Sequence, residues 1–179
     1  MDRARPLAVV LCLGWLAAPA ALADPVEADG SVHVGAPPDR VFAVLTDFDA
    51  WGRVFESVEM LGTERVDAHH VRIRQRVERA GLTLTYTLAA SVDPAARRVD
   101  VALDPSDRGQ MEELASTWTV APDPSGGSIV TLHVVSRTNL PVPRFVERRV
   151  AKRTTRDSLD DLVRALERRA ASRDRVGAI

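Results

Sequence analysis

Two polar side chains, Gln75 and Tyr86, occupy apolar positions in segments whose alternation is typical of β-strands. A buried amide or phenol needs a hydrogen-bond partner, because an unpaired polar group inside a protein costs free energy. That partner is either the backbone or a buried water, or it is the polar group of a bound molecule. If the protein is an enzyme, Tyr86, aided by Gln75 or a histidine, has to serve as its acid or base.

Three larger side chains are expected near these two residues. Trp118 shares one face of a strand with Leu114 and Val120, so its indole belongs either to the core or to the wall of a cavity. Phe55 and Met111 stand beside predicted loops, where they either border the mouth of a cavity or pack the loops against the core. In the ligand-binding interpretation, the residues that contact the bound molecule include Phe55, Gln75, Tyr86, Met111 and Trp118.

Residues 142–156 carry six basic side chains and one acidic one. The basic residues are Arg144, Arg148, Arg149, Lys152, Arg153 and Arg156. One interpretation is a solvated helix face with acidic partners at Asp157, Asp160 and Asp161. The other is contact with an anionic membrane surface, to which each basic residue contributes roughly 1 kcal/mol. In the second case we expect Arg148 or Lys152 to face the hollow of the fold and to bind an acidic head group of the ligand.

The histidines are spaced poorly for a metal site. His69 and His70 are adjacent on a predicted strand and therefore point to opposite faces, while His33 and His133 lie on separate strands at positions that face outward. We therefore predict no metal site. The sequence also lacks the G-x-S-x-G, H-E-x-x-H, phosphate-loop and dinucleotide-binding patterns. Hydrolase chemistry has no support, and we predict no cofactor.

The elements that must position these residues follow from the periodicity of the sequence. A first strand at residues 31–34 precedes a short helix opened by Pro37 and Pro38 and a second short helix capped by Asp47. Strands with alternating polarity then run from residue 58 to residue 136, with a bulge at Gly62. Short turns between consecutive strands imply antiparallel pairing. With one long helix at residues 142–171, we predict an α+β fold with a curved antiparallel sheet of about seven strands.

The long helix carries two apolar faces that do not coincide. Its second half repeats Leu159, Leu162 and Leu166 at the spacing of one buried stripe. Apolar residues of its first half, such as Phe145 and Val146, centre on another side at about 100° per residue. The helix therefore either bends, or its first half lies over something other than the dry core.

Residues 1–23 have the pattern of a cleavable signal peptide. Arg3 and Arg5 precede an apolar run over residues 7–18, and Ala21 and Ala23 form a small-x-small cleavage site. The run is short for a membrane span, so we expect a secreted or periplasmic protein, with retention by an uncleaved anchor as the alternative. The remaining residues, 24–179, form one domain, and the net charge of −1 argues against nucleic-acid binding.

Over about residues 30–171 the sequence resembles the START-like, helix-grip superfamily, also called SRPBCC. The resemblance is carried by residues 38–47 with Trp51, Phe55 and Val58, by residues 114–120 with Pro122, Gly126, Gly127 and Val130, and by Leu140, Pro141, Leu159, Leu162 and Glu167. This superfamily includes polyketide cyclase/dehydrase-like, coenzyme Q-binding and lipid-transfer proteins. The resemblance implies a helix-grip fold, in which a curved sheet holds one long helix above a hollow.

Three functions remain open. The first is an exported carrier that holds a hydrophobic small molecule, such as a lipid, sterol-like or polyketide-like compound, between the sheet and the C-terminal helix. The second is a polyketide cyclase/dehydrase-like enzyme that depends on Tyr86. The third is a protein that docks on an acidic partner through its basic helix. The predicted leader and the absence of catalytic motifs favour the first function.

Overall fold

The computed structural model describes residues 24–79 and 81–176, so the predicted leader lies outside the described residues. The elements in chain order are β1 (Val26–Val34), α1 (Pro38–Leu45), the 3₁₀ turn η1 (Phe48–Ala50), α2 (Trp51–Val54), β2 (Val58–Arg65), β3 (His70–Arg79), β4 (Leu82–Asp93), β5 (Arg98–Leu103), β6 (Met111–Pro122), β7 (Ser128–Thr138) and α3 (Arg144–Val176). Among the described residues, no helix combines the length and hydropathy needed to cross a membrane.

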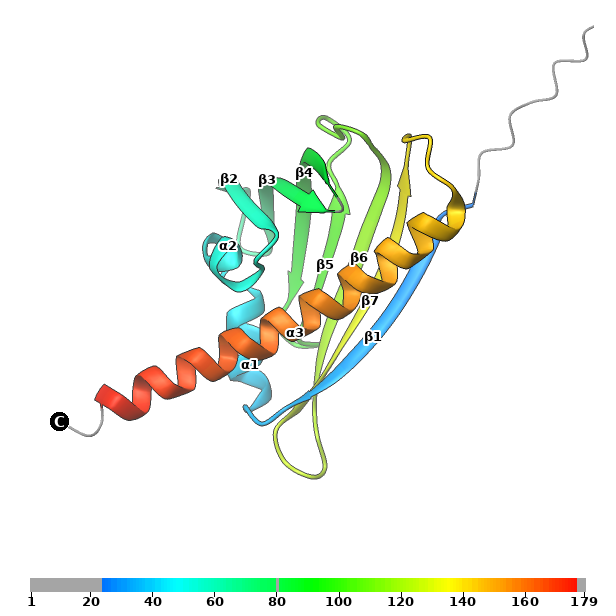
Figure 1. Cartoon of the computed structure of the whole chain (residues 1–179). Coiled ribbons are helices and arrows are strands. Elements are labelled where there is room, and N and C mark those ends of the chain that lie inside the picture. Colours follow the sequence, from blue (N-terminus) through cyan, green and yellow to red (C-terminus); the bar gives the residue numbers. More distant parts are fainter. Residues whose placement is uncertain (1–23, 80, 177–179) are drawn as a thin grey trace, which may run out of the picture.

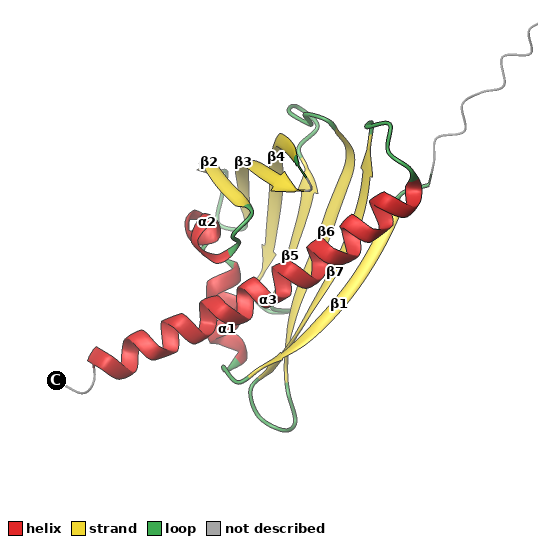
Figure 2. Cartoon of the chain, in the orientation of Figure 1, coloured by secondary structure: helices red, strands yellow, loops and turns green. Residues whose placement is uncertain are grey.

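The described strands form one seven-stranded sheet in the order β1-β7-β6-β5-β4-β3-β2. Every neighbouring pair is antiparallel. The sheet curves around α3, which crosses it diagonally, while α1 and α2 lie near one end (Figures 1 and 2). The predicted α+β helix-grip architecture, with two short helices after the first strand and one long C-terminal helix, is confirmed.

Alternating polarity decides which side of each strand is buried. On β3, Val71, Ile73 and Val77 are buried, while the intervening Arg72 and Arg74 are partly or fully exposed. Side chains on a strand alternate between the two faces of a sheet, so the face toward α3 collects the apolar residues. The predicted bulge on β2 is also present, because the pairing with β3 shifts register between Met60 and Gly62.

The two halves of α3 pack against different surfaces. In the second half, Leu159, Leu162 and Leu166 join the main core. In the first half, Ala151 is buried with Val26 and Ala28 of β1 in a separate small cluster. The apolar residues that define the phase shift do not make this contact, because Phe145 is 73% exposed and Val146 is only partly buried.

Close approach of α3 to β1 depends on Gly30. A Cβ atom at this position would lie 2.7 Å from Leu159 Cδ1 and 3.0 Å from Thr155 Cγ2. Thr155 is itself buried, and its hydroxyl donates a hydrogen bond to the carbonyl oxygen of Ala151 at 3.0 Å. The absence of a side chain at Gly30 lets the side chains of Leu159 and Thr155 pack directly against the strand.

The short helices differ from the prediction in one detail. Asp47 makes no side-chain capping hydrogen bond to the turn that follows it. Its carboxylate instead accepts a hydrogen bond from Arg169 of α3 at 3.0 Å. Asp47 thus occupies the predicted N-cap position, but its carboxylate caps no backbone amide and instead tethers the short helices to the end of the long one.

Candidate ligand-binding cavity

A cavity of about 130 Å³ lies between the inner face of the sheet, the α2–β2 segment and α3. Strand side chains form most of its wall, and α3 contributes Thr154 and Ser158. The residues that line it are Trp51, Phe55, Ser57, Val58, Gln75, Val77, Tyr86, Leu88, Val101, Leu114, Ser116, Trp118, Leu132, Val134, Thr154 and Ser158. The hollow implied by the helix-grip fold is therefore present, and it is small.

Aromatic rings form one wall of the cavity. Phe55 lies 5.8 Å from Trp118 between ring centroids, and Trp51 meets Phe55 edge-on at 5.4 Å. The indole nitrogen of Trp51 donates a hydrogen bond to the carbonyl oxygen of Leu45 at 3.0 Å, which fixes this ring from behind. Aromatic contacts of this kind stabilise the rings in defined positions, and they give this side of the cavity an apolar surface.

Gln75 and Tyr86 form a polar site in the same wall. They are directly opposite each other on β3 and β4. The Gln75 side-chain nitrogen donates a hydrogen bond to the Tyr86 hydroxyl at 3.2 Å. Gln75 Oε1 is buried without a hydrogen-bond partner, and so is Ser57 Oγ, which lines the same cavity. Buried oxygens without partners are uncommon in native proteins, and here two of them border one small space.

Charged side chains are absent from the lining of this cavity within the described part of the chain. The described histidines lie outside it as well. His33 Nδ1 is 2.7 Å from an Asp123 oxygen and His133 Nδ1 is 2.6 Å from Asp29, both on the exposed surface. Across residues 24–79 and 81–176, no group of three or more His, Cys, Asp and Glu side chains could hold a metal ion.

Four of the predicted contact residues line the cavity: Phe55, Gln75, Tyr86 and Trp118. Met111 is buried in the main core and does not line the cavity, so of its two predicted roles it takes packing against the core and not a place at the mouth. The β6 strand begins at Met111, and the side chain packs into the sheet interior at that end.

The predicted position of Arg148 or Lys152 facing the hollow is wrong, because both side chains are exposed and neither lines the cavity. The buried residues Ala151, Thr155, Leu159, Leu162 and Leu166 form one stripe along α3, at spacings of three and four residues. Extending the Leu159–Leu166 stripe backwards therefore reaches the buried Thr155 correctly, but Lys152 directly follows the buried Ala151 and points to solvent, and Arg148 lies before this first buried residue. Lys152 borders an open groove beside β1 that also includes Asp29 and Asp157.

Sequence reasoning missed Ser57, Thr154 and Ser158 as lining residues, and it placed Asp161 among the acidic partners on a solvated face of the helix. Asp161 is only 3% exposed. Its carboxylate pairs with Arg164 and accepts a hydrogen bond from the backbone nitrogen of Glu56 at 3.1 Å. This carboxylate fixes the α2–β2 loop beside the cavity. The one signal in the sequence is its spacing of four residues before Ala165, which is also buried.

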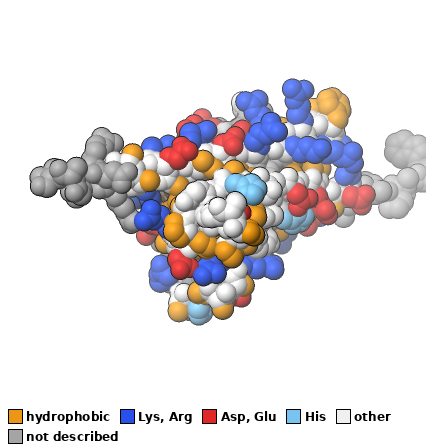
Figure 3. Space-filling model, turned by 90° about the horizontal axis from the view of Figure 1, so that it is seen from below, with side chains coloured by type: hydrophobic (Ala, Val, Ile, Leu, Met, Phe, Trp, Pro, Cys, Tyr) orange, Lys and Arg blue, Asp and Glu red, His pale blue; other side chains and the backbone are white. Residues whose placement is uncertain are grey.

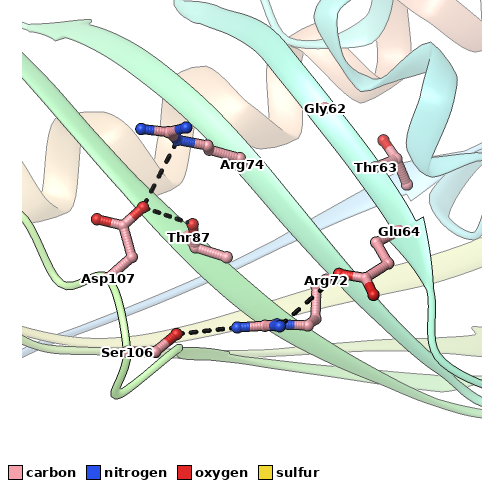
Figure 4. Close-up of a pocket in the computed structure, with 8 residues that line it drawn as sticks. All are labelled: Gly62, Thr63, Glu64, Arg72, Arg74, Thr87, Ser106 and Asp107. Carbon is pink, nitrogen blue, oxygen red and sulfur yellow. Dashed lines mark hydrogen bonds and ion pairs between the residues drawn. The ribbon is translucent and has the colours of Figure 1, made fainter.

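A second, larger hollow lies on the opposite face of the sheet, away from α3 (Figure 4). Arg72 donates to Asp104 at 2.8 Å and to the Ser106 hydroxyl at 2.9 Å, and Arg74 lies 3.6 Å from Asp107. Hydrogen bonds from Ser106, together with Arg72, lower the pKa of Asp104 to about 2. The charged side chains around this hollow pair with one another, so this face of the sheet carries a surface ion-pair network.

The comparisons with known proteins agree with this geometry. Residues 25–171 match the family model described as polyketide cyclase/dehydrase and lipid transport. No protein of curated function matches the sequence significantly. Among solved structures, the Zhui aromatase/cyclase from Streptomyces sp. R1128 superposes with a TM-score of 0.70 at 19% identity, covering 82% of this chain and 96% of that one.

Two further structures are similar. A START superfamily protein from Mycobacterium smegmatis has a TM-score of 0.66 at 17% identity, covering 79% of this chain and 97% of its own. The di-domain aromatase/cyclase BexL from the BE-7585A biosynthetic pathway has a TM-score of 0.61 at 26% identity, over 79% of this chain and 46% of that chain. The chain belongs to the polyketide cyclase/dehydrase and lipid transport family, and it shares its fold with a START superfamily protein.

Proposed function

We propose that this protein is an exported carrier that holds a hydrophobic small molecule in the cavity between the sheet and α3. The observation that carries the proposal is an uncharged, aromatic-walled cavity in which Gln75 Oε1 and Ser57 Oγ lack partners. Burial of apolar ligand surface supplies about 25 cal/mol per Å². A few polar contacts then orient the molecule, as in most small-molecule sites.

The lining chemistry favours binding over catalysis. Proton transfer usually needs a histidine, a carboxylate, a lysine or a tyrosine within reach of the substrate. Of these, the described lining contains only Tyr86. A cyclase/dehydrase-like activity, which the similarity to the Zhui aromatase/cyclase suggests as the second candidate, therefore depends on this one phenol. Turnover of a polyketone model compound that disappears in Tyr86→Phe would establish the enzyme in place of the carrier.

The carrier is tested by mass spectrometry of the native protein purified from the exported fraction. We expect a bound hydrophobic molecule that leaves on denaturation. Ser116→Leu places a larger side chain into the cavity and is expected to remove the molecule, while Ser91→Leu, on the opposite face of the sheet, retains it. Wild-type protein that is folded, empty and unable to take up any hydrophobic compound would overturn the proposal.

Export is the second part of the proposal and rests on the leader pattern of residues 1–23. Expression of the full chain in a bacterial host, followed by separation of periplasm and cytoplasm, tests it. We expect the mature protein in the periplasm with Asp24 at its N-terminus. Full-length protein that stays in the membrane fraction would point to an uncleaved anchor, and full-length protein in the cytoplasm would refute export.

The exposed side of the first half of α3 suggests where the carrier meets its source of ligand. Arg148, Arg149, Lys152, Arg153 and Arg156 are exposed there. Phe145 is 73% exposed on the first turn of the same helix. Lys and Arg side chains gather over this part of the molecule (Figure 3). Basic residues around an exposed aromatic ring suit an anionic lipid surface, and we propose that the protein docks on such a membrane through this side.

Vesicle flotation tests the docking surface. We expect binding to vesicles that contain anionic lipid and none to neutral vesicles. Arg149→Glu with Arg153→Glu should abolish it, and Arg40→Glu with Arg65→Glu, a charge-matched exposed pair elsewhere, should leave most of it. Equal loss in both double variants would show a general charge effect. Capture of an acidic protein without vesicle binding would support partner docking in place of membrane contact.

A further inference from the structure

We infer that the cavity selects a neutral, single-ring molecule that carries a hydroxyl group, bound with the hydroxyl at Gln75 and Ser57. The inference rests on the proposed function, since it assumes that the cavity holds a small molecule. It narrows that molecule by size, by hydrogen-bonding chemistry and by charge.

The volume sets the size. At about 130 Å³, the cavity is close to the engineered cavity of about 150 Å³ that takes up benzene in another protein. One six-membered ring with short substituents fills such a space. A fused multi-ring compound or a long acyl chain does not fit inside it, and larger molecules would have to leave most of their surface outside.

The unpartnered polar atoms set the hydrogen-bonding chemistry. The side-chain nitrogen of Gln75 donates its hydrogen bond to the Tyr86 hydroxyl, whereas Gln75 Oε1 is an acceptor that has no donor. The carboxamide is 5% exposed, so bulk water does not satisfy it. Ser57 Oγ, also without a partner, donates or accepts as its rotor turns. A ligand hydroxyl supplies a donor for Gln75 and an acceptor for Ser57, whereas a hydrocarbon or an ether supplies no donor.

The lining sets the charge. A buried carboxylate needs a cationic partner or several hydrogen-bond donors to offset its loss of hydration. The described lining offers no Lys, Arg or His, and the basic side chains Arg148 and Lys152 of α3 point to solvent. Only neutral donors, such as the hydroxyls of Ser116, Thr154 and Ser158, would face a bound carboxylate, so the site favours a neutral molecule over a carboxylic acid of the same size.

Binding of three ring probes of matched size tests the inference on protein stripped of any bound molecule. Phenol carries the hydroxyl, toluene replaces it with a methyl group, and benzoate carries a negative charge. We expect phenol and toluene to bind and benzoate to bind at least tenfold more weakly than phenol, by calorimetry or ligand-observed NMR. The decisive quantity is the ratio of the toluene to the phenol dissociation constant, measured in each variant.

Gln75→Leu should lower this ratio about tenfold, because losing a hydrogen-bond acceptor affects only the probe with a donor. Gln110→Leu makes the same change at an exposed position and should leave the ratio unchanged. Ser57→Ala should shift the ratio in the same direction by a smaller factor, and it serves if Gln75→Leu does not fold. An unchanged ratio in both cavity variants, or benzoate binding as tight as phenol binding, would overturn the inference.

The outcomes separate this inference from the proposed function. If a larger hydrophobic molecule binds and Ser116→Leu blocks it while phenol does not bind, the carrier stands and the single-ring assignment falls. If no probe and no larger molecule binds, and only water lies beside Gln75 and Ser57, both the carrier function and the single-ring assignment are wrong. Phenol binding that is lost in Ser116→Leu and weakened in Gln75→Leu supports both.

Discussion

Replacing Gln75 with leucine should make the ligand-free protein more stable. Gln75 is 5% exposed, and its Oε1 atom has no hydrogen-bond partner. A leucine of similar size removes this unpaired acceptor and adds apolar surface to a wall that already contains Val77 and Leu88. Residues that lower the stability of a protein are expected at functional sites. This substitution therefore tests whether Gln75 serves binding and not stability.

The magnitude follows from two opposing terms. Removing a buried unsatisfied acceptor regains about 1–3 kcal/mol, while losing the 3.2 Å hydrogen bond from Gln75 to Tyr86 costs about 0.5–1.5 kcal/mol. The midpoints leave a net gain of about 1 kcal/mol. In a domain of this size, 1 kcal/mol raises the melting temperature by roughly 2–4 °C.

Urea unfolding and calorimetry of stripped protein measure the change, with Gln110→Leu as the control. Gln110 is exposed, so the same substitution there should stay within about 0.5 kcal/mol of the wild type. A fall in the unfolding free energy of more than about 1 kcal/mol in Gln75→Leu would refute the reasoning. It would mean that Oε1 is satisfied in the empty protein, for example by an ordered water. In a separate measurement, added phenol should stabilise the wild type more than it stabilises Gln75→Leu if the cavity binds phenol through Gln75 as proposed.

Three other substitutions test the fold that holds the cavity. Gly30→Ala should destabilise the protein by about 1–3 kcal/mol in urea unfolding, because the new methyl group collides with α3, whereas Gly35→Ala meets nothing within 4 Å and should be nearly neutral. Asp104 has a folded-state pKa of about 2, below the unfolded value of about 3.9. The stability that its ionised carboxylate contributes is therefore complete above pH 4 and is lost as the pH falls toward 2. Asp104→Asn should make the melting temperature depend less on pH over that interval. Asp161→Ala leaves the α2–β2 loop without its acceptor and should cost about 1–3 kcal/mol, against little change in the exposed Asp160→Ala.

The sheet and its inward-facing residues could be predicted because a strand has a strict period of two residues. Once one face of β3 is apolar, Gln75 must lie on that face, and Tyr86 and Trp118 follow by the same rule on β4 and β6. The arrangement of the strands could be predicted from their order and from the turn signals between them, since consecutive antiparallel strands allow few arrangements. These are the residues for which the prediction and the cavity lining agree.

The helix could not be oriented in the same way. Its period of 3.6 residues does not fix a face by itself, because the buried side depends on the angle at which the helix crosses the strands. In this protein one buried stripe runs from Ala151 through Thr155 to Leu159 and Leu166. Arg148 and Lys152 were assigned by extending the later face, but Arg148 lies before the first buried residue of the stripe, and Lys152, next to Ala151, points to solvent. Ser57 gave no periodic signal because it stands in a loop.

The same alternation explains why charge plays no part inside the cavity. On β3, the inward-facing Gln75 is flanked by Arg74 and Arg76, which point outward and pair with Asp107 and Glu59, while Gln75 faces the cavity. On α3, the basic side chains lie on the exposed surface while Thr154 and Ser158 reach the cavity. Both elements thus separate charge from the interior. Charge is left to act at the surface, where it suits docking, and discrimination inside the cavity falls to shape and to the Gln75 acceptor. A carrier built this way should take up neutral molecules at the same rate with or without added salt once it is docked, while docking itself weakens as salt screens the basic surface.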